Sequence, residues 1–479
     1  MDTKIIRNVE EVTSAYEPIL IEEVEKLWEE IRPSFKHKII VLDDDPTGVQ
    51  TVHNVSVYTD WSEETIERGF LEENQMFFIL TNSRAFTQVE TKQVHQDIAE
   101  RIHTTAKKHN TPYIIISRGD STLRGHYPLE TEVMKETIER NSEAAIDGEI
   151  ILPFFKEGGR LTVDNIHYVQ NKEVLLPAGE TEFAKDRTFG FKASHLGEWV
   201  EEKSNGAFSK EDVTYITLEE IRERQVEEIS RKLLQVKNFN KVVVNALEEA
   251  DVKVFSCALV LAMNKGKRFI FRTAATFTKV IGNISSRPLL KREDLIKEEL
   301  SNGGLIIVGS HVQKTTVQLQ HLQSVSSLHF IEFDCHLVLD KEAFHKEIAR
   351  VQTLAEEKVS AGVTTVIFTK RERLDLGEGM KEEELNLSVE ISEAVTSIVR
   401  NFKVRPNFII AKGGITSSDV GTKGLCVKRA TVAGQIAPGI PVWKTGEEST
   451  FPNIPYVIFP GNVGADTTLK EVVLELENK

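Results

Sequence analysis

The stretch 39–51, IIVLDDDPTGVQT, begins as a short apolar run and ends in three adjacent carboxylates, Asp43, Asp44 and Asp45, followed by Pro-Thr-Gly. A short run of aliphatic residues bounded by a turn is typical of a buried strand in a parallel sheet. Three adjacent acids repel one another, so the strand end needs positive charge, a metal ion or a bound proton to stabilise it.

The same alternation of strand and helix patterns continues along the chain. Further short β-rich runs occupy 54–59, 75–81, 111–117, 148–155, 241–246 and 268–274. Helical periodicity appears at 91–109, 218–236 and 250–264. Apolar strands separated by amphipathic helices predict a parallel sheet that is covered on both faces.

A second α/β series follows a polar, poorly packing segment at 283–304, which we interpret as a linker. Its strand-like runs are 305–310, 328–334, 364–369, 407–414, 427–434 and 455–464. A chain of 479 residues also exceeds one ordinary core. The predicted fold class is α/β with two domains, each a mostly parallel sheet covered by helices. The expected boundaries are a helical N-terminal extension at 1–36 and domains at 37–285 and 300–479.

Composition excludes several classes of function. The net charge of -15 argues against nucleic acid or an anionic membrane as the main partner. The three cysteines are far apart and predict neither disulfides nor a zinc site. The charged N-terminus lacks the apolar core of a signal peptide, and no apolar run reaches the length of a membrane span. These features predict a cytoplasmic protein.

The densest polar motif is SRGDSTLRGH at 117–126, directly after a predicted strand. Arg118 and Arg124 can offer bidentate contacts to a carboxylate or phosphate, and Ser121 and Thr122 can donate hydroxyl hydrogen bonds. Glycine allows the backbone to approach a ligand. The motif predicts an anion site, and the alternative is a solvated turn with a helix cap.

The acidic motif DDDPTG also has two interpretations. One carboxylate acts as a general base while another binds Mg²⁺ or orients a basic residue, or else the acids only cap a helix. The motif TNSRAFT at 81–87 places Arg84 after the neighbouring strand. We expect Arg84 and the arginines of 117–126 to be the counter-charges of the three acids.

Glycine-rich turns follow strands in the second half of the chain. Backbone N–H groups at such turns form phosphate cradles. One such turn alone is commonplace, but three in one domain favour a nucleotide. The residues that form them are Gly309 and Ser310, Gly413, Gly414 and Thr416, and Gly461, Asn462 and Gly464.

Several familiar motifs are absent. The sequence contains no GxxxxGK[ST], no HRD or DFG set, and no GxGxxG that opens a strand–helix–strand unit. A P-loop enzyme and a protein kinase are excluded, and a dehydrogenase acting on a sugar acid is disfavoured. A sensor that binds a sugar acid and a nucleotide without transferring phosphate stays open as an alternative.

Taken in order, the motifs LDDDPTG, TNSRAFT, SRGDSTLRGHYPLE, VDNIHYV, IIVGS, AKGGITSSDVG and PGNVGAD resemble the four-carbon acid sugar kinase family, from about Lys38 to about Val473. The resemblance implies an N-terminal sugar-acid domain, a C-terminal nucleotide domain and ATP-dependent phosphorylation of a terminal hydroxyl, with Mg²⁺. It implies that Asp45, with Asp44 beside it, lies at the substrate hydroxyl. We expect Asp45 to be the catalytic base and Asp43 to have a structural role.

The resemblance also implies binding residues. Those for the acid sugar are Arg84, Arg118, Gly119, Asp120 and Ser121. Those for the nucleotide are Ser310, Gly413, Gly414, Ile415, Thr416 and Gly461. Many members carry Lys-Ser where this chain has Phe459-Pro460, which bears on the nucleotide site. No metal ligands are assigned, and association into a homo-oligomer is left open.

Overall fold

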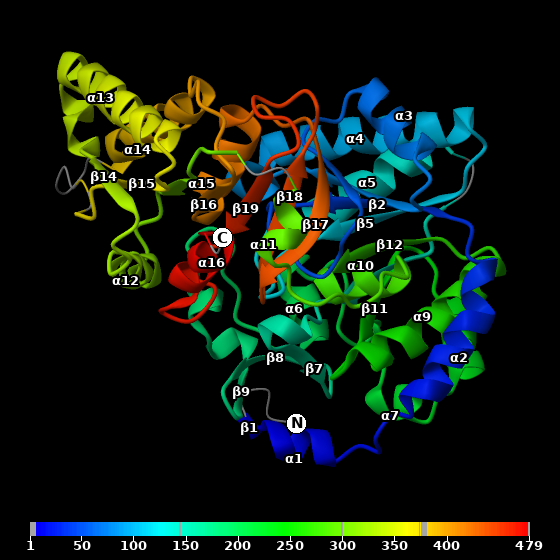
Figure 1. Ribbon diagram of the computed structural model, residues 1–479. Helices are drawn as coiled ribbons and strands as arrows, with labels where there is room; N and C mark the ends of the chain where they lie inside the picture. Colours follow the sequence, from blue (N-terminus) through cyan, green and yellow to red (C-terminus); the bar gives the residue numbers. More distant parts are fainter. Residues whose placement is uncertain (1–5, 143–144, 298–299, 373, 375–380, 478–479) are drawn as a thin grey trace. The chain divides into compact units, whose positions relative to one another are not determined.

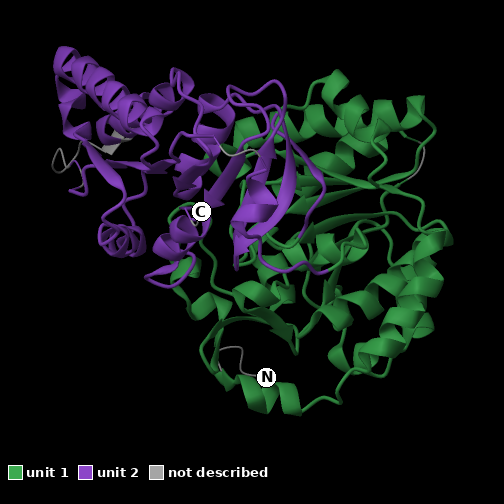
Figure 2. Cartoon of the chain, viewed as in Figure 1, with its two compact units in different colours: residues 1–51, 60–285 green, residues 52–59, 286–479 purple. Residues whose placement is uncertain are grey.

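The protein is represented by a computed structural model that describes residues 6–142, 145–297, 300–372, 374 and 381–477 (Figure 1). Parts of the predicted N-terminal extension (1–5) and of the predicted linker (298–299) lie outside these residues. The chain divides into two compact units, unit 1 of residues 1–51 and 60–285 and unit 2 of residues 52–59 and 286–479 (Figure 2). Both units are α/β, in keeping with the predicted fold class.

Unit 1 is built on seven parallel strands in the order β10-β11-β6-β12-β5-β2-β4. All six residues of β2 are buried, which is why its sequence reads as a continuous apolar run. The strands are β2 (Lys38–Asp43), β4 (Met76–Leu80), β5 (Tyr113–Arg118), β6 (Gly148–Leu152), β10 (Thr214–Ile216), β11 (Asn240–Val244) and β12 (Phe269–Thr273).

Helices cover both faces of this sheet (Figure 1). One layer is α3 (Glu63–Leu71), α4 (Gln88–Lys108) and α5 (Leu129–Arg140); the other includes α2 (Ile21–Ile31), α7 (Leu218–Arg222), α8 (Val226–Gln235), α9 (Glu249–Asn264) and α10 (Ala275–Ile281). The helix expected at 218–236 is split into α7 and α8 by Arg224, which has a φ of 54°. Short 3-10 turns are η1 (Arg32–Ser34) and η2 (Ser83–Ala85).

The expected N-terminal extension is part of unit 1. Trp28 on α2 is 2% exposed and donates from Nε1 to Asn283 Oδ1 at 2.9 Å, and α2 packs on α9. Pro18 falls between α1 (Val9–Ser14) and α2, as expected of a residue that interrupts a helix.

A second, antiparallel sheet of unit 1, in the order β1-β9-β8-β7, was not predicted. Its strands are β1 (Arg7–Asn8), β7 (Arg160–Val163), β8 (Ile166–Asn171) and β9 (Val174–Pro177). Around it lie η3 (Lys156–Gly158), η4 (Ala178–Glu180), η5 (Glu182–Lys185) and α6 (Leu196–Lys203). Asp164 and Asn165 form its first hairpin turn with positive φ values of 52° and 65°.

The described residues of unit 2 form eight strands in the order β3-β17-β18-β19-β16-β13-β15-β14. The pairs from β3 to β19 are antiparallel and those from β19 to β14 are parallel. The strands are β3 (Ser56–Tyr58), β13 (Leu305–Val308), β14 (His329–Phe333), β15 (Thr365–Thr369), β16 (Ile409–Lys412), β17 (Arg429–Ala437), β18 (Ile440–Thr445) and β19 (Pro455–Phe459).

Strand β3 makes the division of the chain differ from the continuous 37–285 range that we expected. Residues 52–59 belong to unit 2 because Ser56 pairs in register with Thr431 of β17 and Asn54 N donates to Val432 O at 2.7 Å. Arg429 also donates from Nη2 to Ser56 Oγ at 3.0 Å. Pairing between segments this far apart leaves no local signal in the sequence.

The helical elements of unit 2 are α11 (Arg292–Leu295), α12 (Gln313–Leu322), η6 (Cys335–Leu339), α13 (Lys341–Ser360), α14 (Lys381–Arg400), α15 (Gly414–Asp419), the π-helical turn η7 (Val420–Gly424) and α16 (Thr468–Glu477). Aliphatic residues of β13, β16 and β19 form its core together with Leu319, Leu322 and Leu469. This core holds the turns after those three strands in fixed positions.

Candidate functional site

Three neighbouring strands of unit 1 end at one edge of the sheet. Asp43 at the end of β2 is in register with Arg118 at the end of β5, and Arg118 is in register with Thr273 at the end of β12. Ligands of open α/β sheets bind outside the carboxyl ends of the strands. This edge therefore brings together the acidic motif at 43–48 and the arginine-rich motif at 117–126.

Asp43 is buried against Arg118 and Gly48. Its side chain is 2% exposed and lies 3.2 Å from Arg118 Nη1. A Cβ at position 48 would lie 2.0 Å from Asp43 Oδ2, so the glycine of DDDPTG is required by this packing. Burial raises the pKa of Asp43 to about 8, although Arg118 opposes the rise. This setting fits the structural role expected for Asp43.

Asp44 lies between two arginines. Arg84 Nε is 3.0 Å from Asp44 Oδ2, and Arg84 Nη2 donates to Asp44 Oδ1 at 3.0 Å. Arg118 Nη1 lies 3.6 Å from the same Oδ1. Burial raises the pKa of Asp44, and Arg84 and Arg118 oppose that rise. The hydrogen bond from Nη2 and the ion-pair contact of Nε together hold the Asp44 carboxylate and the guanidinium of Arg84 in place.

Asp45 is the most accessible of the three acids. Its side chain is 21% exposed, against 2% for Asp43 and 3% for Asp44. Its Oδ1 accepts from Thr47 N at 2.8 Å and from the Thr47 hydroxyl, and Oδ2 lies 3.2 Å from Arg84 Nη2. Burial acts to raise the pKa of Asp45, but Arg84 and the Thr47 hydrogen bonds outweigh it and the pKa is lowered. Asp45 is therefore an ionised carboxylate that a ligand can reach.

These contacts form a continuous chain of alternating acids and arginines, Asp43–Arg118–Asp44–Arg84–Asp45, which we call the charge network. Arg84 and Arg118 each lie between two acids, as expected from the sequence. Arg124, which was also expected to be a counter-charge of the cluster, pairs instead with Asp120 and Asp186. The two arginines and the proton retained by Asp43 stabilise the three acids at one strand end.

The remaining residues of the arginine-rich motif form a second group of ion pairs. Asp120 Oδ2 accepts from Arg124 Nε at 2.7 Å and from the Thr122 hydroxyl. Arg124 Nη1 also lies 3.6 Å from Asp186 Oδ2. Burial acts to raise the pKa of Asp120, but Arg84 and Arg124 outweigh it, so the pKa is lowered. The guanidinium of Arg124 is 25% exposed, which leaves it accessible to an anion.

Two predicted hydroxyl donors are turned inward. Ser121 is 8% exposed and Thr122 is 1% exposed. His167 donates from Nε2 to Ser121 O at 2.8 Å, and burial lowers the pKa of His167 to about 4, so this ring is neutral. Thr122 donates its hydroxyl to Asp120. The structure thus shows both residues shaping the loop.

The sequence did not single out Arg272 or Glu130. Arg272 is 5% exposed and donates from Nη2 to Arg124 O at 2.9 Å. Its guanidinium packs against Gly119, where an added Cβ would lie 1.1 Å from Arg272 Nη1. Glu130 accepts from Ser83 Oγ at 2.7 Å and from Ser117 Oγ at 3.1 Å. Arg272 is the next-to-last residue of β12, and a charged residue at the end of an otherwise apolar strand was the available signal.

In unit 2 a pocket of 340 Å³ lies at the ends of β13 and β16. Its lining includes five residues of the predicted nucleotide site, Ser310, Gly413, Gly414, Ile415 and Thr416. Gly413 has a φ of +126°, and a Cβ there would lie 2.8 Å from Ser310 Cβ. A Cβ at Gly309 would lie 2.4 Å from Thr416 Oγ1. A larger residue at either position would fill the cradle.

The other predicted nucleotide residues lie on the neighbouring 460–465 loop and not in the pocket lining. A Cβ at Gly461 would be 3.1 Å from Ser310 Oγ, so this loop borders the pocket. Asn462 is exposed, and Gly464 has a φ of +85° with Thr468 packed against it. Of these three residues, Gly461 is the one that the distances above place next to a residue of the pocket lining.

Four side chains hold the carbonyl groups of this loop. Lys412 Nζ donates to Gly461 O at 3.1 Å, Lys314 Nζ to Gly464 O at 3.0 Å, Thr315 Oγ1 to Gly461 O at 3.0 Å and Gln318 Nε2 to Val463 O at 3.1 Å.

Lys412 occupies the space beside the unusual Phe459-Pro460 pair. Its ammonium lies 4.2 Å from the centroid of the Phe459 ring and also donates to Pro460 O. Burial, with a contribution from Lys314, lowers the pKa of Lys412 to about 7. An anion bound nearby would therefore favour its protonated form.

The donor set of unit 2 fits a nucleotide better than a free metal ion. The described residues include no group of three or more His, Cys, Asp or Glu that could hold a metal. Asp419 is the acid in the described lining of the pocket, and it is already paired with Ser392 Oγ at 2.6 Å and Lys423 Nζ at 2.9 Å. Mg²⁺ is commonly bound through substrate phosphates with one or two carboxylates, and Asp419 is the residue here that fits such a role.

Within the described residues, no helix combines the length and the apolar character needed to cross a membrane. The three cysteines, Cys257, Cys335 and Cys426, are free thiols.

Comparison with known families now assigns the two units. Residues 39–281 match the family described as the sugar-binding N-terminal domain, and residues 305–469 match the nucleotide-binding C-terminal domain. The fold and the two sites therefore define a two-domain sugar- and nucleotide-binding protein. The chain belongs to the four-carbon acid sugar kinase family.

Individual relatives are distant. A D-erythronate kinase of Heliobacterium modesticaldum (strain ATCC 51547 / Ice1) is 22% identical over 323 residues, which is 65% of this chain and 66% of that relative. A solved structure from Salmonella typhimurium LT2 has a TM-score of 0.66 at 15% identity. The match covers 92% of this chain and 98% of the Salmonella chain. The solved structure of a Haemophilus influenzae protein has a TM-score of 0.58 at 14% identity. This match covers 91% of this chain and 99% of the Haemophilus chain. Both solved structures share the fold.

Proposed function

We propose that the protein is an ATP-dependent kinase that phosphorylates a terminal hydroxyl of a short, four-carbon sugar acid. The observation that carries the proposal is the charge network, which presents the ionised and accessible Asp45 beside Arg84 at the strand ends of the sugar-binding unit. The similarity to a D-erythronate kinase supports the same substrate class.

The acid sugar would be oriented by its carboxylate. Arg124 is the best placed of the arginines for a direct contact, because its guanidinium is 25% exposed; Arg84 follows at 23%. Arg118 is 5% exposed and already lies between Asp43 and Asp44, so its role in this proposal is to position the network. Bidentate pairing of Arg124 with the carboxylate would fix that end of the acid sugar and leave the far hydroxyl free to approach Asp45.

Asp45 would accept the proton of that hydroxyl. Its lowered pKa keeps it ionised at neutral pH, and Thr47 and Arg84 fix the orientation of its two oxygens. A positioned base contributes about 10²–10⁴-fold to a proton-transfer step. Asp44 would hold Arg84 in place through its two contacts.

In unit 2, ATP would supply the phosphoryl group, with Mg²⁺ bound through its phosphates. The glycines at 309, 413 and 414 leave room for the nucleotide, and Ser310 and Thr416 offer hydroxyl donors. Lys412 would hold the 460–465 loop against this site and add positive charge when protonated. Catalysis of phosphoryl transfer depends mainly on positioning and electrostatics, which is what these residues provide.

The test is release of ADP from ATP·Mg²⁺ in the presence of D- and L-threonate, D- and L-erythronate and 3-oxo-tetronate. We expect turnover with at least one acid and none with erythritol, which has the same chain length but no carboxylate. Thermal stabilisation by an acid and by ATP without any ADP release would instead favour the non-catalytic sensor. Turnover with erythritol as fast as with the acids would contradict recognition through a carboxylate.

A further inference from the structure

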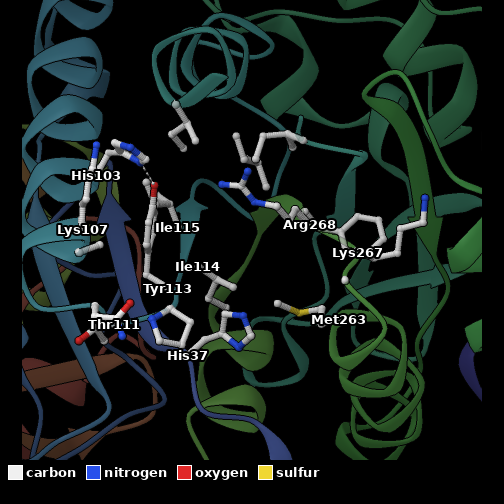
Figure 3. Close-up of a pocket in the computed structure, with 18 residues that line it drawn as sticks. His37, His103, Lys107, Thr111, Tyr113, Ile114, Ile115, Met263, Lys267 and Arg268 are labelled. Carbon is white, nitrogen blue, oxygen red and sulfur yellow. Dashed lines mark hydrogen bonds between the residues drawn. The ribbon is translucent and has the colours of Figure 1, made fainter. Parts of the chain in front are cut away.

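A second cavity of unit 1 lies at the opposite edge of the sheet from the charge network. It has a volume of 480 Å³ and is bounded by the residues that precede or begin β2, β5, β6 and β12 (Figure 3). These are the amino ends of the strands, whereas Asp43 and Arg118 lie at the carboxyl ends. The cavity therefore belongs to a different site from the one proposed for the acid sugar.

The polar lining of this cavity is basic. It carries Lys107 and His103 of α4, His37 before β2, Tyr113 of β5, and Lys267 and Arg268 before β12. In the part of the lining that the structure describes, there is no aspartate or glutamate. A lining of this composition in a chain with a net charge of -15 creates a local positive potential that would attract an anion.

Arg268 is the electrostatic centre of the cavity. Figure 3 shows its guanidinium directed toward the side of the cavity that carries Tyr113 and His103. Burial lowers the pKa of His37 and of His103, and the positive charge of Arg268 lowers both further. Burial raises the pKa of Tyr113 to about 12, and the same arginine opposes that rise. One cation thus acts on three side chains, from α4, from β5 and from the segment before β2.

Lys267 differs from its neighbour. Its ammonium lies 2.8 Å from Asp147 Oδ1 and is directed away from the cavity in Figure 3. It holds the loop before β12. An occupant would meet the exposed Lys107 and the guanidinium of Arg268, whose Nη1 also donates to Ser142 Oγ at 3.4 Å.

Two further features of the lining indicate which kind of molecule would fit the cavity. The apolar lining is formed by Ile114, Ile115, Ile138, Ile146, Met263 and Ile270, which suits a compact apolar body. His37 Nδ1 is buried, and among the described residues it has no hydrogen-bond partner, although its ring stacks on Phe35 with centroids 5.0 Å apart. A buried ring nitrogen without a partner is a donor or acceptor that a ligand could satisfy.

We propose that this cavity binds a small organic oxyanion, with a phosphate, sulfate or carboxylate group held by Arg268, His103 and His37 and an apolar body on the isoleucine-lined wall. The chemistry of the lining identifies the class of ligand, and the site does not depend on the kinase activity proposed above. Binding there would place a second ligand on the same sheet as the acid sugar.

The probes are phenyl phosphate, phenyl sulfate and benzoate, with phenol as the uncharged control, titrated into the full chain without ATP or sugar acid. We expect the anions to raise the melting temperature of unit 1 by about 2 °C or more at saturating concentration, and phenol to have no effect. Binding of phenyl phosphate and phenyl sulfate without binding of benzoate would indicate a site for a tetrahedral anion. Binding of benzoate alone would indicate a site for a carboxylate. No shift with any anion would overturn the proposal.

Substitutions separate this cavity from nonspecific binding. Arg268→Gln should weaken phenyl sulfate binding by about tenfold or more, whereas Arg231→Gln on the exposed face of α8 should leave it unchanged. Lys107→Gln, on an exposed side chain that tolerates replacement, provides a second variant and should weaken binding several-fold. Equal binding by Arg268→Gln, Lys107→Gln and the unaltered protein would contradict the site.

The pH dependence gives an independent readout. Phenyl sulfate keeps one negative charge between pH 6 and pH 8, so any change in affinity comes from the protein. His37 and His103 are neutral at the upper pH and face Arg268, Lys107 and Tyr113, so a bound anion would favour their protonation. Affinity should therefore rise as pH falls from 8 to 6, and an affinity independent of pH would exclude the two histidines from the site.

Discussion

The two candidate ligand sites use different chemistry to hold negative charge. In unit 1 the strand ends carry side chains, and the charge network pairs each arginine with two acids. In unit 2 the strand ends carry glycines, and the cradle depends on space around the backbone and one buried lysine. Charged side chains can select one orientation of the reacting group, whereas a backbone cradle accepts any phosphate of suitable shape. The difference predicts that substitutions in the two units have separable effects.

The largest effect is expected at the acid that serves as the base. Asp45→Asn preserves the shape of the side chain but removes its capacity to accept a proton, so kcat should fall by about 10²-fold or more. ATP binding, measured by calorimetry, should stay near normal because Asp45 lies in unit 1. The partly exposed Asp97→Asn on α4 is the matched control and should retain full turnover. Retained turnover in Asp45→Asn would remove Asp45 from this role.

The next effect is expected at the arginine of the network. Arg84→Gln removes both contacts to Asp44 and the contact to Asp45, so we expect KM for the sugar acid to rise by about 10–100-fold, with a fall in kcat as Asp45 loses its orientation. Steady-state kinetics with varied acid at saturating ATP measures both. Arg84→Lys keeps the charge but not the fork and should recover only part of the loss. Full recovery would show that charge alone is sufficient.

In unit 2 we expect a smaller effect, which falls on the binding of ATP and not on the binding of the sugar acid. Gly413→Ala introduces a Cβ 2.8 Å from Ser310 Cβ at a φ of +126°, which should weaken ATP binding by about tenfold through lost space and backbone strain. Binding of the sugar acid should be unaffected. Gly206→Ala has a similar backbone cost, since its φ is +80°, but meets no atom within 4 Å, and it should bind ATP normally. Normal ATP binding by Gly413→Ala would exclude this cradle.

The smallest effect concerns stability. Folded Asp43 keeps its proton up to about pH 8, whereas an unfolded aspartate loses it near pH 4, so between these values the folded state binds more protons and stability falls as pH rises. Asp43→Asn cannot ionise, and its free energy of unfolding should decline less between about pH 5 and pH 9, by roughly 1 kcal/mol or more. Denaturant titrations at both pH values measure the slope. An unchanged slope would show that Asp43 is already ionised in the folded protein.

Much of the fold follows from local patterns in the sequence. The aliphatic run before Asp43 is buried on both faces of a parallel sheet, and the glycines after β13 and β16 lie around one pocket. The pairing of Arg84 and Arg118 with the acids was expected because parallel strands end at a common edge.

The remaining features depend on long-range packing. The transfer of β3 to unit 2, the small antiparallel sheet and the position of Arg272 under Gly119 join segments that are far apart in sequence. Lys412 lies within the strand-like run 407–414 of the sequence, and only its contacts with Phe459 and the 460–465 loop connect it to the nucleotide site. The basic cavity at the amino ends of the strands gathers residues from five segments and has no motif of its own.

Hydrogen exchange with each ligand alone tests the central claim most directly. A turnover-supporting sugar acid should slow exchange at 43–48 and 118–126 and leave 309–312, 413–417 and 460–465 unchanged. A nonhydrolysable ATP analogue with Mg²⁺ should give the reverse pattern. Protection of 118–126 by the ATP analogue, or of 413–417 by the sugar acid, would contradict the assignment of the charge network to the acceptor and the glycine cradle to the nucleotide.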